Sequence, residues 1–232
     1  MAIKIKSCKE LRAFIDLTNV KPDATESDIK KLCREAKRYN FNAACVCSSN
    51  ARLAKKELGD KAKLVVVVGF PFGGASTIAK VAETKQAVID GADEIDMVIN
   101  IGALKSRKYD LVKKDIAEVV KAAKPRGVKV IFETGYLTKA EIIKACKISK
   151  AAGAKFVKTA TGFGRRGATV ADIKLMRKIV GLNFGIKAAG GIGDCKTAFA
   201  MIKAGANRIG ASRGVDIILG RTGEKMTGVW RE

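Results

Sequence analysis

The chain has 232 residues, 47% of them apolar, which is long for an average domain but ordinary for one α/β barrel. Its net charge of +22 would attract anionic substrates, but the basic residues are scattered, with no basic tail or interleaved aromatic residues, which disfavours specific nucleic-acid binding. No histidine is present, which excludes a histidine general base and disfavours a zinc site, and no apolar run is long enough to cross a bilayer.

Apolar or β-branched runs recur along the chain, and a helical pattern lies between each run and the next. Eight parallel strands alternating with helices predict a (β/α)₈ barrel, in the α/β class. A doubly wound open sheet is the alternative, because its local signals are the same. No linker-like composition shift divides the chain, so we expect a single domain over 1–232. The predicted strands are 13–17, 43–47, 64–70, 94–100, 128–133, 156–160, 185–189 and 208–212.

Capping residues predict where several helices begin and end. A side-chain oxygen just before a helical pattern can accept a hydrogen bond from the first turn. Gly-Ala pairs recur shortly before three of the strands, where glycine is suited to end a helix in a left-handed conformation. The predicted caps are Thr25 (with Asp28 three residues on), Ser76, Thr138, Thr169 and Asp194, and the predicted helix-ending glycines are Gly91, Gly153 and Gly205.

Six cysteines are scattered along the chain without a C-x-x-C pair. The start of the chain also lacks the pattern of a secretory signal. We therefore expect a cytoplasmic protein in which the thiols are reduced and mostly buried. The residues concerned are Cys8, Cys33, Cys45, Cys47, Cys146 and Cys195.

Strand alternation places polar side chains inside the predicted barrel. Along 94–100 one set of residues faces the helices and the alternate set, Glu94, Asp96, Val98 and Asn100, faces inward. The same rule turns Phe156 and Lys158 inward, and Lys187 inward between the small residues Gly185 and Ala189. Asp96, Lys158 and Lys187 are thus predicted to converge near the C-terminal ends of their strands, where barrel enzymes keep their chemistry.

Two inward lysines indicate covalent amine catalysis on a carbonyl substrate. A neutral lysine amine forms an imine with an aldehyde or ketone, and the imine accepts electrons when a C–C bond forms or breaks. An ordinary lysine, with a pKa of about 10.4, is almost wholly protonated at pH 7. A neighbouring ammonium and partial burial both disfavour the charged form, and Asp96 can relay protons. The alternative is a buried Lys–Asp ion pair that only stabilises the barrel.

Glycine-rich segments follow the last two predicted strands, at 188–194 and 210–214. Glycine lets backbone N–H groups approach an anion closely, and barrels often hold a phosphate group at this place. Each segment leads into a predicted helix. The sequence therefore predicts a phosphorylated substrate.

Six short motifs are spread over about residues 11–220: "IDLT" (15–18), "VVGFPFG" (67–73), "DEIDMVIN" (93–100), "FVKTATGFG" (156–164), "IKAAGGI" (186–192) and "RIGAS" (208–212). Together they resemble the motifs of the deoxyribose-phosphate aldolases. The resemblance implies a class I aldolase that reversibly cleaves 2-deoxy-D-ribose 5-phosphate to D-glyceraldehyde 3-phosphate and acetaldehyde, without metal or organic cofactor. It implies that Lys158 is the Schiff-base lysine, Lys187 its pKa-lowering neighbour and Asp96 the proton-relay acid. The implied substrate-binding residues are Asp16, Thr18, Cys47, Thr161, Gly162, Gly190, Gly191, Gly210 and Ser212.

Three departures from the family pattern stand out. Ala160 replaces the serine of K-T-S-T-G, Arg213 follows Ser212 where a second serine is usual, and the chain ends "TGVWRE" (227–232) without the tyrosine of some members. Arg213 could clamp a phosphate or point to solvent. None of these changes removes a bond-making residue, so we expect an active enzyme with altered efficiency.

Two other functions stay open at this point. Another Schiff-base aldolase of phosphosugars would use the same lysine chemistry, and a catalytically dead barrel could bind nucleic acid through its charge. We expect a small-molecule phosphosugar as substrate, a homodimer or higher homo-oligomer, and no membrane partner.

Overall fold

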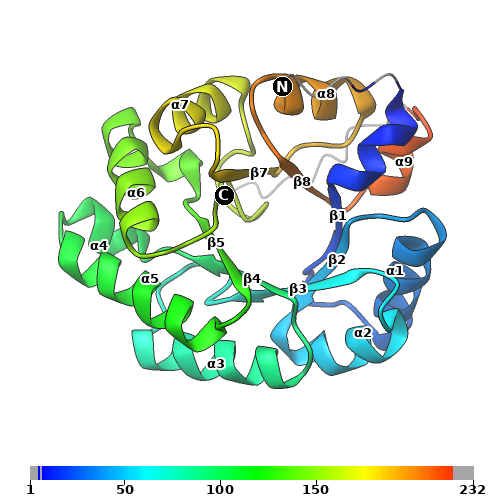
Figure 1. Cartoon of the computed structure of the whole chain (residues 1–232), viewed down its shortest axis with the longest axis horizontal. Coiled ribbons are helices and arrows are strands. Elements are labelled where there is room, and N and C mark those ends of the chain that lie inside the picture. The colour runs from blue at the N-terminus through cyan, green and yellow to red at the C-terminus, as the bar shows by residue number, and fades with distance from the viewer. Residues whose placement is uncertain (1–4, 6, 222–232) are drawn as a thin grey trace.

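The structure, a computed structural model, describes residue 5 and residues 7–221, and in that part of the chain eight parallel strands form a closed barrel (Figure 1). Each strand pairs with the next one along the chain, and β8 pairs with β1. The predicted barrel is confirmed, and the open-sheet alternative is excluded because β8 closes on β1. The strands are β1 (Ile15–Asn19), β2 (Ala43–Cys47), β3 (Lys63–Val68), β4 (Glu94–Val98), β5 (Gly127–Ile131), β6 (Phe156–Lys158), β7 (Gly185–Ala189) and β8 (Arg208–Ala211).

Helices form a ring around this barrel, as Figure 1 shows. None of the helices within the described residues is long and apolar enough to cross a membrane. The α-helices are α1 (Glu26–Arg38), α2 (Ala51–Leu58), α3 (Thr77–Ile89), α4 (Ile101–Lys105), α5 (Tyr109–Ala123), α6 (Lys139–Ala151), α7 (Val170–Val180), α8 (Cys195–Lys203) and α9 (Gly214–Ile218). Short 3₁₀ helices are η1 (Cys8–Phe14), η2 (Ser48–Asn50) and η3 (Thr134–Tyr136).

The predicted caps are confirmed. Thr25 and Thr138 each form a full capping box, in which the threonine hydroxyl accepts from the third residue of the helix and that residue's carboxylate accepts from the threonine N–H. Ser76, Thr169 and Asp194 accept hydrogen bonds from the first turns of α3, α7 and α8. The three helix-ending glycines have φ values of 97°, 86° and 115°, which L-residues rarely adopt.

Strand alternation separates two environments. The outward side chains of the strands, Ile95, Val157 and Ile186 among them, join the large apolar core between barrel and helices. Inside the barrel a small apolar cluster contains Cys45, Val67 and their neighbours from β2 and β3. The other six strands, β4 to β8 and β1, instead fill the interior with charged side chains, so most of the barrel has a polar core.

Several strands are shorter than predicted, or displaced. Residues 13–14 belong to η1 and not to β1, and β6 ends at Lys158, before the loop that continues through Thr161. The inward position predicted for Asn100 is wrong. Asn100 lies beyond β4 and its side chain accepts a hydrogen bond from the N–H of Ala103, so it caps α4. Asparagine competes well for this capping role, which strand parity does not anticipate.

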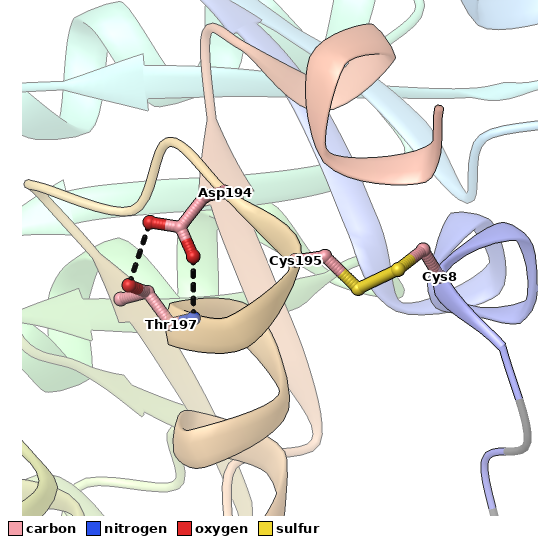
Figure 2. The surroundings of a disulfide bond; sticks show 4 residues. All are labelled: Cys8, Asp194, Cys195 and Thr197. Atoms are coloured by element: carbon pink, nitrogen blue, oxygen red, sulfur yellow. Dashed lines mark hydrogen bonds between the residues drawn. A yellow bond between two sulfur atoms is a disulfide. The ribbon is translucent and has the colours of Figure 1, made fainter. Parts of the chain in front are cut away.

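The prediction of uniformly reduced cysteines is wrong for one pair. Cys8 in η1 and Cys195, the first residue of α8, form a disulfide across 187 positions of sequence (Figure 2). Beside it, Asp194 accepts hydrogen bonds of 2.8 Å from the N–H and the hydroxyl of Thr197. The remaining cysteines are free thiols, of which only Cys47 is half-buried and the rest are buried. Spacing could not predict the pair, because only the closure of the barrel brings the two ends of the chain together.

We expect the disulfide to stabilise the fold, because it closes a long loop in the unfolded chain. Cys8→Ser should lower the free energy of unfolding by about 2–4 kcal/mol. For a chain of this size each kcal/mol corresponds to roughly 2–4 °C in Tm. A reductant should lower the Tm of the wild-type protein to that of the variant and leave the variant unchanged. An unchanged wild-type Tm under reducing conditions would contradict this expectation.

Candidate active site

The Asp96 carboxylate, fully buried in the barrel, lies at the centre of a cluster of cations. Its Oδ2 is 2.9 Å from Lys158 Nζ and 2.8 Å from Lys187 Nζ, and its Oδ1 is 3.0 Å from Lys129 Nζ. The predicted convergence of Asp96, Lys158 and Lys187 is therefore present in the structure. Both lysine ammonium groups bind the same carboxylate oxygen, which fixes them side by side.

The cluster continues from Lys187 into a closed ring. Lys187 Nζ also lies 2.6 Å from Asp16 Oδ2, whose other oxygen lies 2.8 Å from Arg208 Nη1. Arg208 Nη1 in turn lies 3.6 Å from Glu94 Oε2, and Glu94 contacts Lys129. Three carboxylates thus alternate with three cations around the barrel interior, and Lys158 is an additional cation bound at Asp96.

Parallel pairing positions these side chains. Residues opposite each other on adjacent strands point to the same face, and the register pairs Asp96 with Lys129, Lys158 with Lys187, and Lys187 with Arg208. Gly210 on β8 provides the space that Lys187 needs, because a Cβ at this position would lie 2.9 Å from Lys187 Cε. Lys158 is the last residue of β6, whereas Asp96 and Lys187 lie in the middle of their strands, deeper than predicted.

The cluster holds its carboxylates and Lys187 in their charged forms. Burial alone would raise the pKa of Asp96, but Lys129, Lys158 and Lys187 outweigh burial and hold the pKa well below its usual range. The pKa of Asp16 is also lowered, because Lys187 and Arg208 outweigh the effect of burial. Burial would lower the pKa of Lys187, but Asp16 and Asp96 outweigh it and raise this pKa above the ordinary lysine value.

A pocket of about 420 Å³ opens above this cluster, at the C-terminal end of the barrel. Lys158, with 3% of its surface exposed, is the one member of the charged cluster that lines the pocket, among the residues that the structure describes. Lys187, Asp16 and Asp96 are fully buried beneath it. A small carbonyl compound in the pocket would therefore meet the Lys158 amine and no other amine of the cluster.

Most of the predicted substrate-binding residues also line this pocket. They are Thr18, Thr161, Gly162, Gly190, Gly191, Gly210 and Ser212. Asp16 does not, because it lies in the charged ring below. Cys47 does not line it either: its thiol donates to the carbonyl oxygen of Val20 at 3.7 Å, and only Val20 reaches the pocket wall. Burial, with smaller contributions from Cys45 and Glu83, raises the pKa of the Cys47 thiol.

The loop after β6 is held by a residue that the sequence analysis missed. Glu133, 2% exposed and in a left-handed conformation with φ of 56°, accepts hydrogen bonds from the N–H (2.9 Å) and the hydroxyl of Thr161. Gly164 leaves space for this carboxylate, since a Cβ there would lie 2.5 Å from Glu133 Cδ. The sequence did contain a signal for this residue, because a carboxylate that ends an apolar run is followed directly by threonine and glycine.

The sequence analysis also missed two site residues, Lys129 and Arg208. It placed Glu94 inside the barrel but did not predict its ion pairs in the ring. A lysine inside the apolar run "VKVIF" raises the same question as Lys158, and strand alternation applied to that run would have found Lys129. Arg208 begins its strand, where an arginine is ordinary, so only the closed barrel shows that it reaches Asp16.

Two of the sequence departures lie near the pocket. Ala160 is fully buried, and a Cβ added at Gly190 would lie 3.4 Å from its methyl group. Arg213 precedes α9 as its N-cap residue, donates from Nε to Asp216 at 3.0 Å and lies beside Gly193. Arg213 is not among the pocket-lining residues, so its role toward a phosphate stays a prediction. The C-terminal "TGVWRE" lies outside the described residues.

Comparison with known proteins agrees with this geometry. Residues 13–222 match the DeoC/LacD family of aldolases. The chain belongs to this aldolase family. It is 57% identical to the deoxyribose-phosphate aldolase of Thermococcus kodakarensis, over 93% of this chain and 99% of that protein. It is 56% identical to that of Clostridium tetani, over 90% and 98% of the two chains.

A solved structure of the aldolase family shares the fold. The deoxyribose-phosphate aldolase of Aeropyrum pernix, described as a unique tetramer, superposes with a TM-score of 0.85 at 32% identity and covers 92% of this chain and 91% of its own. The aldolase family is thus supported by the sequence match, the barrel and the arrangement of the lysines.

Proposed function

We propose that this aldolase reversibly cleaves 2-deoxy-D-ribose 5-phosphate to D-glyceraldehyde 3-phosphate and acetaldehyde through a Schiff base on Lys158. The curated relatives at 55–57% identity carry the corresponding name. The observation that carries the assignment of Lys158 is its position: its ammonium lines the pocket while Lys187 is sealed beneath it.

The Lys158 amine attacks C1 of the open-chain sugar, and loss of water from the resulting carbinolamine gives the imine. When a base removes the proton of the C3 hydroxyl, the C2–C3 bond breaks and its electron pair passes into the protonated imine as an enamine. Glyceraldehyde 3-phosphate leaves. Protonation of the enamine at C2 and hydrolysis of the imine then release acetaldehyde and restore the amine.

The buried residues place a fixed positive charge beside the Lys158 amine. Lys187 is held as an ammonium by Asp16 and Asp96, so a positive charge is always adjacent to Lys158. Lys158, the lysine of the pair that faces the pocket, shares Asp96 Oδ2 with this buried cation. Asp96 is the group within hydrogen-bond distance of both lysines, so we assign it the proton relay, acting through water to the substrate hydroxyl.

The substrate phosphate would bind at the glycine loops. Gly190 and Gly191, with φ values of 87° and 73°, line the pocket together with Gly210 and Ser212, and glycine allows backbone N–H groups to approach an anion. The cations Lys21 and Lys31 line the same pocket. Because Asp194 already caps α8, the loop N–H groups and not the first turn of that helix are available to the phosphate.

The proposal is tested by incubating the purified protein with 2-deoxy-D-ribose 5-phosphate and following glyceraldehyde 3-phosphate with a coupled reductase. Cleavage is expected, with slower or no cleavage of other phosphosugars. Cleavage of a different phosphosugar alone would favour another Schiff-base aldolase. No cleavage, together with salt-dependent binding to RNA or DNA, would favour the nucleic-acid alternative.

Gly191→Glu tests where the phosphate binds. The added carboxylate should repel the phosphate and raise the KM for deoxyribose 5-phosphate by about tenfold or more relative to the KM for unphosphorylated deoxyribose. Gly191→Gln is the matched control, because it carries the same backbone strain at φ 73° without the charge. Equal changes for the two substrates, or equal effects of Glu and Gln, would place the phosphate elsewhere.

Assembly, location and cofactor need stay proposals. We infer a homodimer or higher homo-oligomer, supported by the tetramer described for the Aeropyrum pernix relative. A cytoplasmic location and a reaction without metal or organic cofactor follow from the family resemblance.

A further inference from the structure

A second cavity, of about 570 Å³, lies at the opposite end of the barrel from the active-site pocket. Its wall contains the first residues of five consecutive strands, β3 to β7, and the segments that precede them. Lys63, Glu94, Gly127, Phe156 and Gly185 are these first residues. We refer to this site as the N-terminal cavity.

The N-terminal cavity is lined by cations that have no other role in the described structure. Arg126 and Lys155 line it with exposed side chains, and neither makes an ion pair or a side-chain hydrogen bond within residues 7–221. The lining carboxylates are already bound. Glu94 is held by Lys129, Lys63 and Arg208, and Asp93 accepts from the N–H of Leu64 at 2.8 Å. The site therefore offers free positive charge.

An apolar wall stands beside these cations. Phe156 and Phe184 are half-buried in the lining, and Leu182 is 87% exposed at its edge. The Phe156 ring lies against Gly185, where a Cβ would lie 2.2 Å from the ring. Lys129 Nζ lies 5.6 Å from the centre of the same ring. An apolar surface next to unpaired cations fits a ligand with a flat apolar part and an anionic part.

We propose that the N-terminal cavity binds a nucleoside phosphate. The phosphates would pair with Arg126 and Lys155, and the base would pack on Phe184 and Leu182. The amide of Asn183, in the same wall, can hydrogen-bond the base edge.

The cavity is connected to the catalytic centre by ion pairs. Glu94 and Lys129 both line it, and Lys129 Nζ lies 3.0 Å from Asp96 Oδ1 on the other side. The N-terminal cavity therefore borders the ring of ion pairs that contains Asp96. The binding itself does not depend on the proposed aldolase activity.

Binding of ADP and of pyrophosphate to the intact protein is measured by titration calorimetry. Pyrophosphate is expected to bind at least tenfold more weakly than ADP, because it lacks the base. The double variant Arg126→Glu/Lys155→Glu should weaken ADP binding by about tenfold or more, since it replaces both phosphate contacts. Lys113→Glu/Lys114→Glu on exposed positions of α5 makes the same change in net charge and should leave binding unchanged.

Gly191→Glu, which alters the active-site pocket, should also leave ADP binding unchanged. No ADP binding to the wild-type protein would overturn the proposal, as would equal weakening by the two double variants. Loss of binding in Gly191→Glu would place ADP in the active-site pocket. Equal affinities for ADP and pyrophosphate would refute recognition of the nucleoside. A changed oligomeric mass in Arg126→Glu/Lys155→Glu would show that a second copy covers the cavity.

Discussion

Replacing Lys158 with methionine is expected to lower kcat for deoxyribose 5-phosphate cleavage by about 10⁴-fold or more, since the imine can no longer form. The fold should persist, because Asp96 keeps Lys129 at 3.0 Å and Lys187 at 2.8 Å. Steady-state kinetics and a thermal unfolding curve measure the two effects. Lys174→Met, at an exposed position of α7, is the matched control and should retain wild-type kinetics. Substantial cleavage by the Lys158 variant would exclude this lysine as the nucleophile.

The second large effect concerns Lys187. In Lys187→Met the Asp96 carboxylate keeps Lys158 but loses the second cation that holds its Oδ2 beside the amine. Because Lys187 then no longer positions the proton-relay carboxylate, we expect kcat at pH 7 to fall by about 10²-fold or more. Steady-state kinetics measures kcat and KM separately.

Lys187→Met should also cost stability, by about 3 kcal/mol, because a buried ion pair loses one partner. Asp16 keeps Arg208, at 2.8 Å, so the barrel should still fold. Lys80→Met is the matched control: Lys80 is equally buried and lies 2.6 Å from Asp115, but it lies outside the barrel interior. It should lose comparable stability and keep the wild-type kcat. A wild-type kcat in the Lys187 variant would mean that Lys187 only stabilises the fold.

The barrel and the convergence of two lysines with Asp96 could be predicted because they depend on local patterns. Strand alternation alone turns Asp96, Lys158 and Lys187 inward, and capping residues such as Thr25 fix where helices start. The contacts that could not be predicted form only when the barrel closes. Arg208 meets Asp16 because β8 pairs with β1, and Cys8 meets Cys195 because η1 packs against α8. Contacts between residues near opposite ends of the chain leave no trace in local periodicity.

The structure also distinguishes the two lysines by their access to the pocket. Strand alternation turns both lysines inward, so it did not tell the nucleophile from its neighbour. In the sequence analysis that distinction came only from the family resemblance. The structure supplies a physical distinction, because Lys158 ends its strand and reaches the pocket, whereas Lys187 is buried between two carboxylates.

The central claim is that Lys158 forms the imine. Borohydride reduction of the protein in the presence of acetaldehyde traps the imine as a stable ethyl group on the lysine nitrogen, and peptide mass mapping locates it. Stoichiometric ethylation of Lys158, with Lys187 and Lys129 unmodified, is the predicted result. Labelling of Lys187 or Lys129 in its place, or no labelling at all, would contradict the account.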